Sequence, residues 1–257
     1  TIPEAVQIFA HTGVQNMQNG YKKFAVTAID DSAYYGCTDA RNLTIAGGKN
    51  VINIGSSAFA ENDALDTVNL AAVEKVGYCA FFNASWLKSF NFGLLLKTID
   101  GYAFNGTRIT EAYLPYGVTS IGQFAFARNS ILNTLLIPSS VTSMSTGILA
   151  ISTVQNLIVN LQDPAKTSGL VYGGSNAAPT INKILVPVAC RNAYRANSYF
   201  SSFANNIYSG SFDMLGYTGY NPTHGQFAAT VTKPCTFNRT KGRRTSYGEV
   251  AIVRNGL

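Results

Sequence analysis

The sequence has little charge and few of the residues that usually carry chemistry. Only 12% of its 257 residues are Asp, Glu, Lys or Arg, about half of the usual share. The two histidines, His11 and His224, lie far apart in the chain. Catalytic or metal-binding histidines need convergent partners, and the sequence offers none. We therefore expect a protein that is not an enzyme and that binds no metal and no cofactor.

Cysteine is scarce and is not arranged for chemistry. The sequence has four, at Cys37, Cys79, Cys190 and Cys235. None belongs to a C-x-x-C pair, which excludes the usual spacings of zinc and thioredoxin-like sites. Four cysteines distributed over most of the chain also cannot form the dense framework of a small disulfide-stabilised domain. We expect isolated buried thiols, which behave as small apolar side chains.

Long apolar runs are missing as well. The longest apolar cluster, residues 90–96, is interrupted by Asn91 and Gly93, and it is far shorter than the roughly 18 residues that a membrane-spanning helix needs. The match Ser85-x-x-Lys88 lacks the partner motifs of a Ser/Lys nucleophile. Because Asn, Ser, Thr and Gly replace the missing charges, the composition favours an extracellular or particle-surface protein.

The sequence does contain a repeat of the form apolar-x-x-apolar-x-apolar. Side chains alternate between the two faces of a strand, so each copy predicts a short strand with one apolar face. The steps between the central residues are 25, 22, 22, 23, 22 and 27. These central residues are Leu43, Val68, Phe90, Ala112, Leu135, Leu157 and Ile184.

A second motif keeps the same phase, with a small residue followed by an aromatic one. Its copies are Ala33-Tyr34, Ala58-Phe59, Ala80-Phe81, Ala103-Phe104, Ala125-Phe126 and a degraded Ile148-Leu149. One copy cannot cover its own apolar face, whereas several stacked copies can. The two motifs together predict a solenoid over residues 24–187, with a parallel sheet and the aromatic rings in its interior.

The stretch "IGQFAFARNSILNTLLIPSSVTS", residues 121–143, resembles the BspA-type leucine-rich repeat. Cys37 falls on the cysteine position of that pattern, and Asn62 and Asn129 replace it in later copies. The resemblance implies a leucine-rich-repeat solenoid that ends in a last strand and a capping helix, here residues 188–207. Proteins of this family are typically secreted or attached to a cell surface, and they serve adhesion or host interaction.

The two flanks of the solenoid have different patterns. Val6, Phe9, Ala10, Val14 and Met17 follow a helical period, which predicts an N-terminal helical cap over residues 1–23. Residues 208–257 are rich in Gly, Tyr and Phe, and alternation near residues 248–253 indicates a strand. We therefore expect a basic, β-rich C-terminal appendix over residues 208–257.

The outward face of the predicted strands is a candidate binding surface. Its members lie between the last two apolar positions of each repeat, so stacking places them side by side about 4.8 Å apart. The first half of this ladder is polar and the second half is apolar. The apolar half could be covered by the appendix or by a neighbouring subunit, form a ligand groove, or stay bare. The ladder residues are Thr44, Asn69, Asn91, Tyr113, Leu136, Ile158 and Leu185.

A basic cluster in the appendix is a second candidate. Lys241, Arg243 and Arg244 could lie on a solvated turn, contact an acidic protein or glycan, or bind nucleic acid. Nucleic-acid binding requires a larger basic field with aromatic residues nearby, so the sequence argues against it.

These observations predict a surface or secreted binding protein that mediates adhesion or protein–protein or glycan interaction through its solenoid. The alternative is a structural subunit or decoration protein of a virion or another large assembly, with neighbouring subunits as partners. The corresponding locations are the extracellular space or cell surface and, in the alternative, the surface of a particle. A repeat scaffold predicts a shape but leaves the ligand open.

Overall fold

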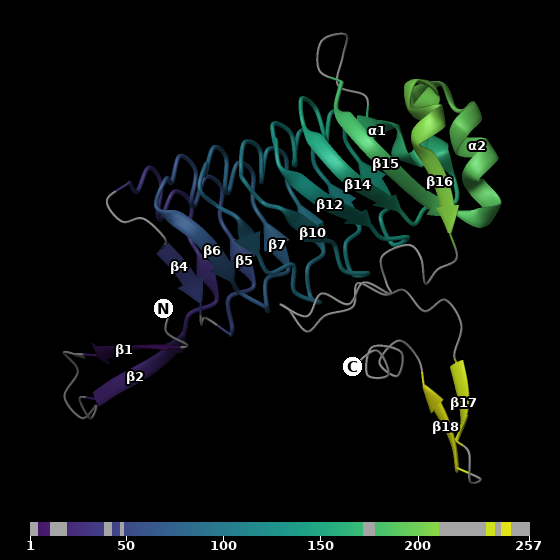
Figure 1. Ribbon diagram of the computed structural model, residues 1–257. Helices are drawn as coiled ribbons and strands as arrows, with labels where there is room; N and C mark the ends of the chain where they lie inside the picture. Colours follow the sequence, from purple (N-terminus) through teal and green to yellow (C-terminus); the bar gives the residue numbers. More distant parts are fainter. Residues whose placement is uncertain are drawn as a thin grey trace.

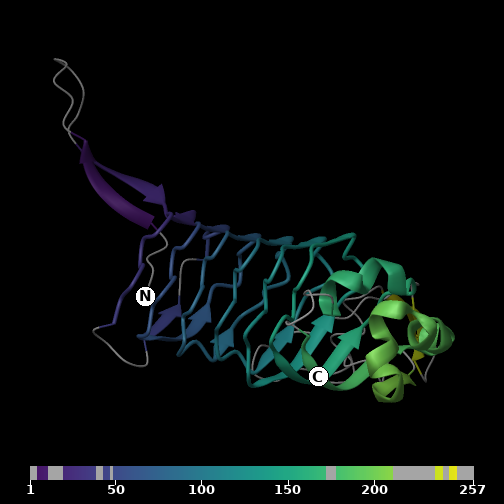
Figure 2. The same cartoon turned by 90° about the horizontal axis from the view of Figure 1, so that it is seen from above.

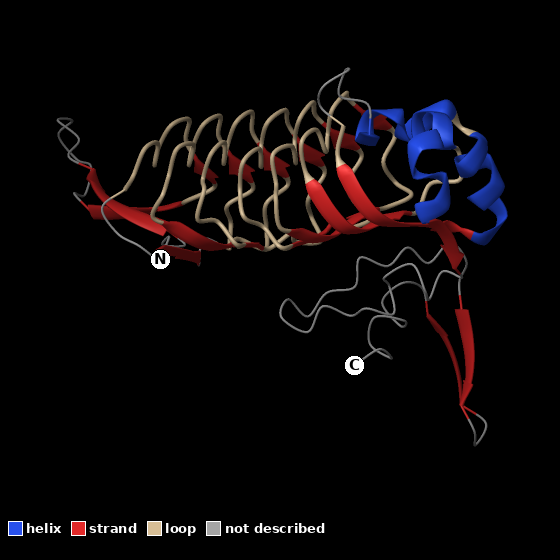
Figure 3. Cartoon of the chain, turned by 45° about the horizontal axis from the view of Figure 1, so that its top comes forward, coloured by secondary structure: helices blue, strands red, loops and turns tan. Residues whose placement is uncertain are grey.

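The computed structural model describes residues 5–10, 20–38, 43–46, 49–171, 178–210, 235–239 and 243–247. Its main body is a row of stacked coils (Figure 1). Each coil runs down a front strand, turns, runs up a back strand and returns through a loop at the upper margin (Figure 3). The predicted leucine-rich-repeat solenoid is confirmed in this part of the chain.

The front of the solenoid is a row of parallel strands. Three strands at the N-terminal end form one sheet, in the order β4 (Leu43–Ala46), β6 (Leu65–Asn69) and β8 (Ser89–Phe90). Five more form the next sheet, in the order β10 (Glu111–Tyr113), β12 (Leu132–Ile137), β14 (Thr153–Val159), β15 (Thr180–Pro187) and β16 (Ile207–Gly210). Strand β16 extends the row beyond residue 187.

The register confirms the repeat except at its first copy. Val68 pairs with Phe90, Ala112 with Leu135, and Leu157 with both Leu135 and Ile184, as the spacing predicts. In the first copy, however, Val68 pairs with Ile45 and not with Leu43. The register shifts between Leu43 and Thr44, and the step from Ile45 to Val68 is then 23 residues, as in the other coils.

The back of the solenoid is a second parallel sheet that the repeat analysis did not identify as strands. Its members are only two residues long, in the order β13 (Ser143–Met144), β11 (Ser120–Ile121), β9 (Thr98–Ile99), β7 (Lys75–Val76), β5 (Asn53–Ile54) and β3 (Ala28–Ile29). Pieces this short carry no visible alternation, so only the pairing between coils identifies them as strands.

The core lies between the two sheets. Phe59, Phe81, Phe104 and Phe126 are each 0% exposed. Their rings stack along the solenoid with centroids 5.1 Å, 5.2 Å and 5.3 Å apart. The prediction that the aromatic residue of the second motif fills the interior is confirmed.

Each coil reverses at its upper margin through two left-handed residues four positions apart, with φ between 52° and 72°. The first turn row consists of Ser32, Ser57, Cys79, Tyr102, Phe124 and Gly147. The second turn row consists of Gly36, Glu61, Asn83, Gly106, Arg128 and Ile151. This left-handed conformation is uncommon outside glycine, so its recurrence shows that every coil uses the same turn.

The position that the sequence aligns with the family's cysteine links the coils from inside. Asn62 is 0% exposed, donates to the Tyr34 carbonyl and accepts from the N–H groups of Ala64 and Leu65. Asn129 donates to the carbonyls of Phe104 and Phe126. A buried carbonyl without a partner would be destabilising, so these amides stabilise the turns.

The C-terminal end of the solenoid is helical. The insert at residues 162–180 forms η1 (Pro164–Thr167) and α1 (Ser168–Val171), and residues 188–206 form η2 (Val188–Cys190), α2 (Arg191–Ala196) and η3 (Ser198–Asn206). Tyr194 and Phe200 are 0% exposed, and the Tyr194 hydroxyl donates to the Leu161 carbonyl at 3.0 Å. Burial strongly raises the pKa of Tyr194.

The predicted N-terminal helix is wrong for the described residues. Strands β1 (Ala5–Ala10) and β2 (Gly20–Ala25) form an antiparallel hairpin there, which extends away from the first coils (Figure 2). Residues 5–10 are apolar except for Gln7, so this short run does not distinguish a strand from a helix and its pairing partner decides. Val14 and Met17 lie outside the described residues.

In the predicted C-terminal appendix, β17 (Cys235–Arg239) and β18 (Arg243–Tyr247) form an antiparallel pair. The strand predicted near residues 248–253 lies outside the described residues, as does the whole segment between Gly210 and Cys235.

Candidate functional site

The outer face of the front strands brings the predicted ladder together. The Asn91 side-chain amide donates to the Asn69 Oδ1 at 2.8 Å. Tyr113 pairs with Leu136, Leu136 with Ile158, Ile158 with Leu185, and Leu185 with Tyr208. Thr44 does not belong to this column because Ala46 is the residue that pairs with Asn69. The ladder therefore consists of two parts, Ala46, Asn69 and Asn91 on the first front sheet and Tyr113 to Tyr208 on the second.

The sequence left open whether the apolar half of the ladder is covered, and two of its four members are buried. Leu136 is 0% exposed and Ile158 is 4% exposed, and Tyr113 and Leu185 are half-buried. Leu136 and Ile158 do not belong to the cluster of core side chains between the sheets. Burying such a side chain stabilises a protein by about 1.5–3 kcal/mol, which disfavours an open apolar row. The exposed members are Asn69, next to the N-terminal end of the ladder, and Tyr208, at its C-terminal end.

Tyr113 lies between the polar and apolar halves of the ladder. Burial raises the pKa of its phenol, the negative charge of Glu111 adds to this effect, and a hydrogen bond with the Thr134 side chain opposes it. The hydroxyl therefore stays protonated at neutral pH and can act as a hydrogen-bond donor.

A second outward column, which the sequence analysis did not identify, lies two residues before the ladder on each strand. Register pairs Thr44 with Thr67, Thr67 with Ser89, Glu111 with Thr134, Thr134 with Asn156, and Asn156 with Lys183. The period of two along a strand could have revealed it, because residues two apart share a face. This second column makes one side of the outer face of the front strands polar. At its C-terminal end, the Lys183 ammonium lies 5.5 Å from the centroid of the Tyr208 ring.

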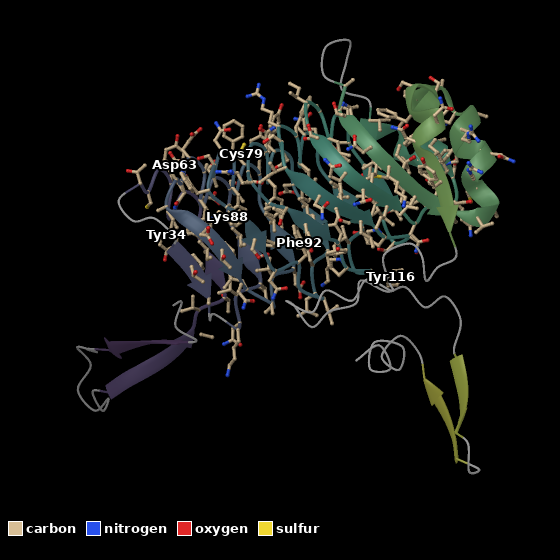
Figure 4. The ribbon with its side chains drawn as sticks, in the orientation of Figure 1. Tyr34, Asp63, Cys79, Lys88, Phe92 and Tyr116 are labelled. Carbon is tan, nitrogen blue, oxygen red and sulfur yellow. The ribbon has the colours of Figure 1, made fainter. Side chains whose placement is uncertain are left out.

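Exposed charges near the coil margins pair between neighbouring coils. Lys88 contacts Asp66 at 2.6 Å (Figure 4 labels Lys88), and Lys97 contacts Glu74 at 2.6 Å. The hydrogen bond from Lys88 lowers the pKa of Asp66, against the effect of burial. Exposed pairs of this kind contribute about 0.2–1 kcal/mol each. These charged side chains therefore pair with each other between coils of the solenoid.

Among the three cysteines whose side chains the structure describes, the expectation of buried thiols is correct only for Cys190. Cys37 is exposed, Cys79 is half-buried and Cys190 is buried. Cys37 is accessible because it belongs to the first of the solenoid's coils. Burial raises the pKa of the Cys79 and Cys190 thiols. In the described part of the chain, no three His, Cys, Asp or Glu side chains gather closely enough to hold a metal ion.

The basic cluster cannot be placed as a site. Lys241 lies outside the described residues, and Arg243 and Arg244 are described only as part of β18. As for membranes, none of the helices within the described ranges has the length and apolar character that a crossing requires.

Comparison with protein families gives a match over more than half of the chain. A family described as "BspA type Leucine rich repeat region" matches in six copies, over residues 7–92 and 27–155. This agrees with the coils described above and with the resemblance seen in residues 121–143. Among curated proteins, none matches the sequence.

Two solved structures share the fold. A leucine-rich repeat protein from Bacteroides ovatus is 22% identical, with a TM-score of 0.50, over 74% of this chain and 59% of that chain. The pneumococcal vaccine antigen PcpA is 18% identical, with a TM-score of 0.51, over 74% of this chain and 44% of that chain. This chain thus spans about three fifths of the first protein and less than half of the second.

Proposed function

The chain belongs to the BspA-type leucine-rich repeat family, and we propose that it is a non-enzymatic binding protein of a cell surface or the extracellular space. It acts in adhesion, through contact with a protein or glycan partner on the outer face of its front strands. A similar solenoid in a protein named as a vaccine antigen supports a surface location.

The observation that carries this proposal is the polar column on the front face. Thr67, Ser89, Glu111, Asn156 and Lys183 lie on parallel front strands and are each at least partly exposed, whereas Thr134, between Glu111 and Asn156, is buried. The stacked core behind them holds the spacing of these groups, so little conformational entropy is lost on binding. Repeat solenoids offer extended binding surfaces of this kind.

Arrays of glycans and of surface proteins, probed with the purified chain, test the proposal. A double variant, Asn69→Arg with Lys183→Glu, changes the size and charge of both ends of the front face, and we expect it to lose at least tenfold in affinity for any partner found. Ser139→Arg, at an exposed loop position outside the strands, is the matched control and should bind normally. Equal binding by all three proteins would contradict a front-face site.

One observation favours the alternative of a subunit in a larger assembly. Leu94, Leu95 and Tyr116 are 59%, 51% and 48% exposed, and they lie in neighbouring coils at the lower margin, where Figure 4 labels Tyr116. Exposed apolar groups that gather in this way are typical of interaction surfaces. Light scattering across a concentration range distinguishes the two functions: a defined oligomer that Leu94→Ser with Tyr116→Ser dissociates supports the assembly, whereas a monomer opposes it.

A further inference from the structure

The single tryptophan of the chain, Trp86, lies just before strand β8, where its coil enters the front face. Its indole is half-buried and has two cations beside it. The guanidinium carbon of Arg108 lies 5.7 Å from the ring centroid, and the Lys88 ammonium lies 6.0 Å from it (Figure 4 labels Lys88). A cation at a distance of about 6 Å or less is attracted to an indole ring. We call Trp86, Lys88 and Arg108 the indole cluster.

The repeat places Arg108 beside Trp86. Arg108 follows Trp86 by 22 residues, and its N–H donates to the Leu87 carbonyl at 2.9 Å. Ile131 occupies the same position one coil further on, 23 residues after Arg108, and it is 41% exposed. Arg108 thus lies between the coil of the indole and a coil that presents an apolar side chain.

The positive charge of Arg108 is not used by the fold. Arg108 is exposed, and within the described residues its guanidinium forms no ion pair. The neighbouring carboxylate of Asp66 contacts Lys88 at 2.6 Å, so the charge of Lys88 is compensated. Glu111, three residues after Arg108, does not pair with it. The indole cluster therefore presents one uncompensated cation, which the ring helps to hold in place.

Hydroxyl and amide groups lie next to the indole cluster. Thr110 and Asn133 are exposed, and their coils are joined there by a hydrogen bond from the Asn133 N–H to the Thr110 carbonyl at 2.7 Å. A threonine hydroxyl and an asparagine amide can each donate and accept, as a sugar hydroxyl does. The surface thus combines one cation, an apolar shoulder, and groups that match hydroxyls.

We propose that the indole cluster binds a carboxylated sugar of an acidic glycan. The sugar carboxylate accepts two hydrogen bonds from the Arg108 guanidinium, and the ring hydroxyls bond to Thr110 and Asn133. The inference rests on the proposed binding function and deepens it, because it assigns the front face a class of ligand. A guanidinium matches the geometry of a carboxylate with two parallel N–H groups. An acidic amino-acid side chain has the same carboxylate but no hydroxyls for Thr110 and Asn133.

The fluorescence of Trp86 tests the inference, because no other tryptophan contributes to the signal. Methyl glucuronide, titrated into the purified chain, should change this fluorescence and shift the NMR signal of the indole N–H saturably. Methyl glucoside has a hydroxymethyl group in place of the carboxylate and should bind about tenfold more weakly. Salt should weaken the binding of the glucuronide, because ions screen exposed charges. If the glucuronide changes neither signal, the inference is wrong.

Two variants of Arg108 separate charge from geometry. Arg108→Gln leaves the tryptophan reporter in place, and it should bind the glucuronide no more tightly than the glucoside. Arg108→Lys keeps the charge but loses the paired N–H groups, so it should recover only part of the affinity. Arg195→Gln, at an exposed position of α2, makes the same change in net charge and is the matched control. Equal losses in Arg108→Gln and Arg195→Gln, or full binding by Arg108→Lys, would contradict the proposed contact.

An acidic amino-acid probe distinguishes a glycan from an acidic protein. N-acetyl-aspartamide, with its free side-chain carboxylate, should bind about tenfold more weakly than the glucuronide, because it lacks the hydroxyls. Binding of this probe as tight as that of the glucuronide would overturn the assignment to a sugar.

Failure of this inference can be distinguished from failure of the proposed function. The titrations depend on Arg108 and not on the double variant Asn69→Arg with Lys183→Glu. A partner from the arrays that loses affinity in the double variant would still support the proposed function if no acidic sugar binds.

Discussion

The middle coils and the C-terminal coils share their front strands but build their backs differently. From Phe59 to Phe126, each coil places an aromatic ring in the core and a two-residue strand behind it. At the C-terminal end, Leu149 takes the place of the ring. The helical segment η1–α1 occupies the back of the next coil, beside the last back strand, β13. Leu170 and Val171 of this segment belong to the same core cluster as the rings.

The difference shows which layer of the solenoid can be replaced. Helix α1 still supplies backbone bonds to the preceding turn, since the Ile148 and Leu149 N–H groups donate to the carbonyls of Gly169 and Leu170 at 3.0 Å and 3.2 Å. Gly169 lies so close to Ser145 that a Cβ would overlap its carbonyl oxygen. The back thus needs only to fill the interior and satisfy the backbone, whereas the front strands keep one register from β10 to β16.

The largest expected effect is a cavity in the ring stack of the middle coils. Phe104→Ala removes a ring that contacts Phe81, Phe90 and Phe126, and it should lower the free energy of unfolding by about 3–5 kcal/mol. Leu149→Ala is the matched change at the end and should cost less, because its coil contains no ring stack. Urea unfolding of both variants measures the difference. Equal losses of unfolding free energy in the two variants would mean that a stacked ring stabilises the fold no more than Leu149 does.

A smaller effect is expected from the buried amide inside the turns. Asn129→Ala removes a donor from the carbonyls of Phe104 and Phe126, and it removes the closer of the two acceptors of the Thr107 hydroxyl. We expect a loss of about 1–3 kcal/mol in the free energy of unfolding. Asn133→Ala, at an exposed position, is the control. An unchanged unfolding midpoint would show that the turns do not depend on this amide.

At the C-terminal end, Tyr194 should make stability depend on pH. Its pKa is raised above the ordinary value of 10.0 in the folded protein, so the folded state keeps the proton after the unfolded chain has released it. The contribution is therefore complete below pH 10 and falls above it, by up to about 1.4 kcal/mol per pH unit. In Tyr194→Phe the free energy of unfolding should fall less steeply above pH 10. At neutral pH it should be lower than in the wild type by about 0.5–1.5 kcal/mol, because the hydrogen bond is lost.

Unfolding measured between pH 8 and pH 11 provides the check. A decline of the same steepness in wild type and Tyr194→Phe would assign the alkaline sensitivity to other groups.

The smallest effect is expected at the exposed ion pairs between middle coils. Lys97→Ala removes the partner of Glu74 and should cost about 0.2–1 kcal/mol at low salt, and less at high salt because ions screen exposed charges. Lys166→Ala, an exposed lysine of the C-terminal insert, is the control. A cost for Lys97→Ala that does not change with salt would contradict an electrostatic origin.

The repeat could be predicted because every coil buries the same apolar positions against its neighbours. Leu135 faces the core from a front strand and Phe126 fills the interior, and apolar residues return at both positions 22 or 23 residues away. This recurrence reveals the strand face and the interior ring. The two-residue back strands carry no such internal pattern, since a pair such as Thr98–Ile99 becomes a strand only through its neighbours in other coils.

The candidate sites were less predictable. The ladder positions from Asn69 to Leu185 followed from alternation, whereas Thr44 was wrong because the register shifts in the first copy. Whether Leu136 and Ile158 are covered was left open by the sequence.

The sequence by itself determined the family, the period of the coils and the aromatic interior, because these depend on contacts that every coil repeats with its neighbour. Only the tertiary structure decided that the N-terminal segment pairs as strands and which outward residues of the front face are covered. Those features depend on single contacts between particular segments, and such contacts leave no periodic trace in the sequence.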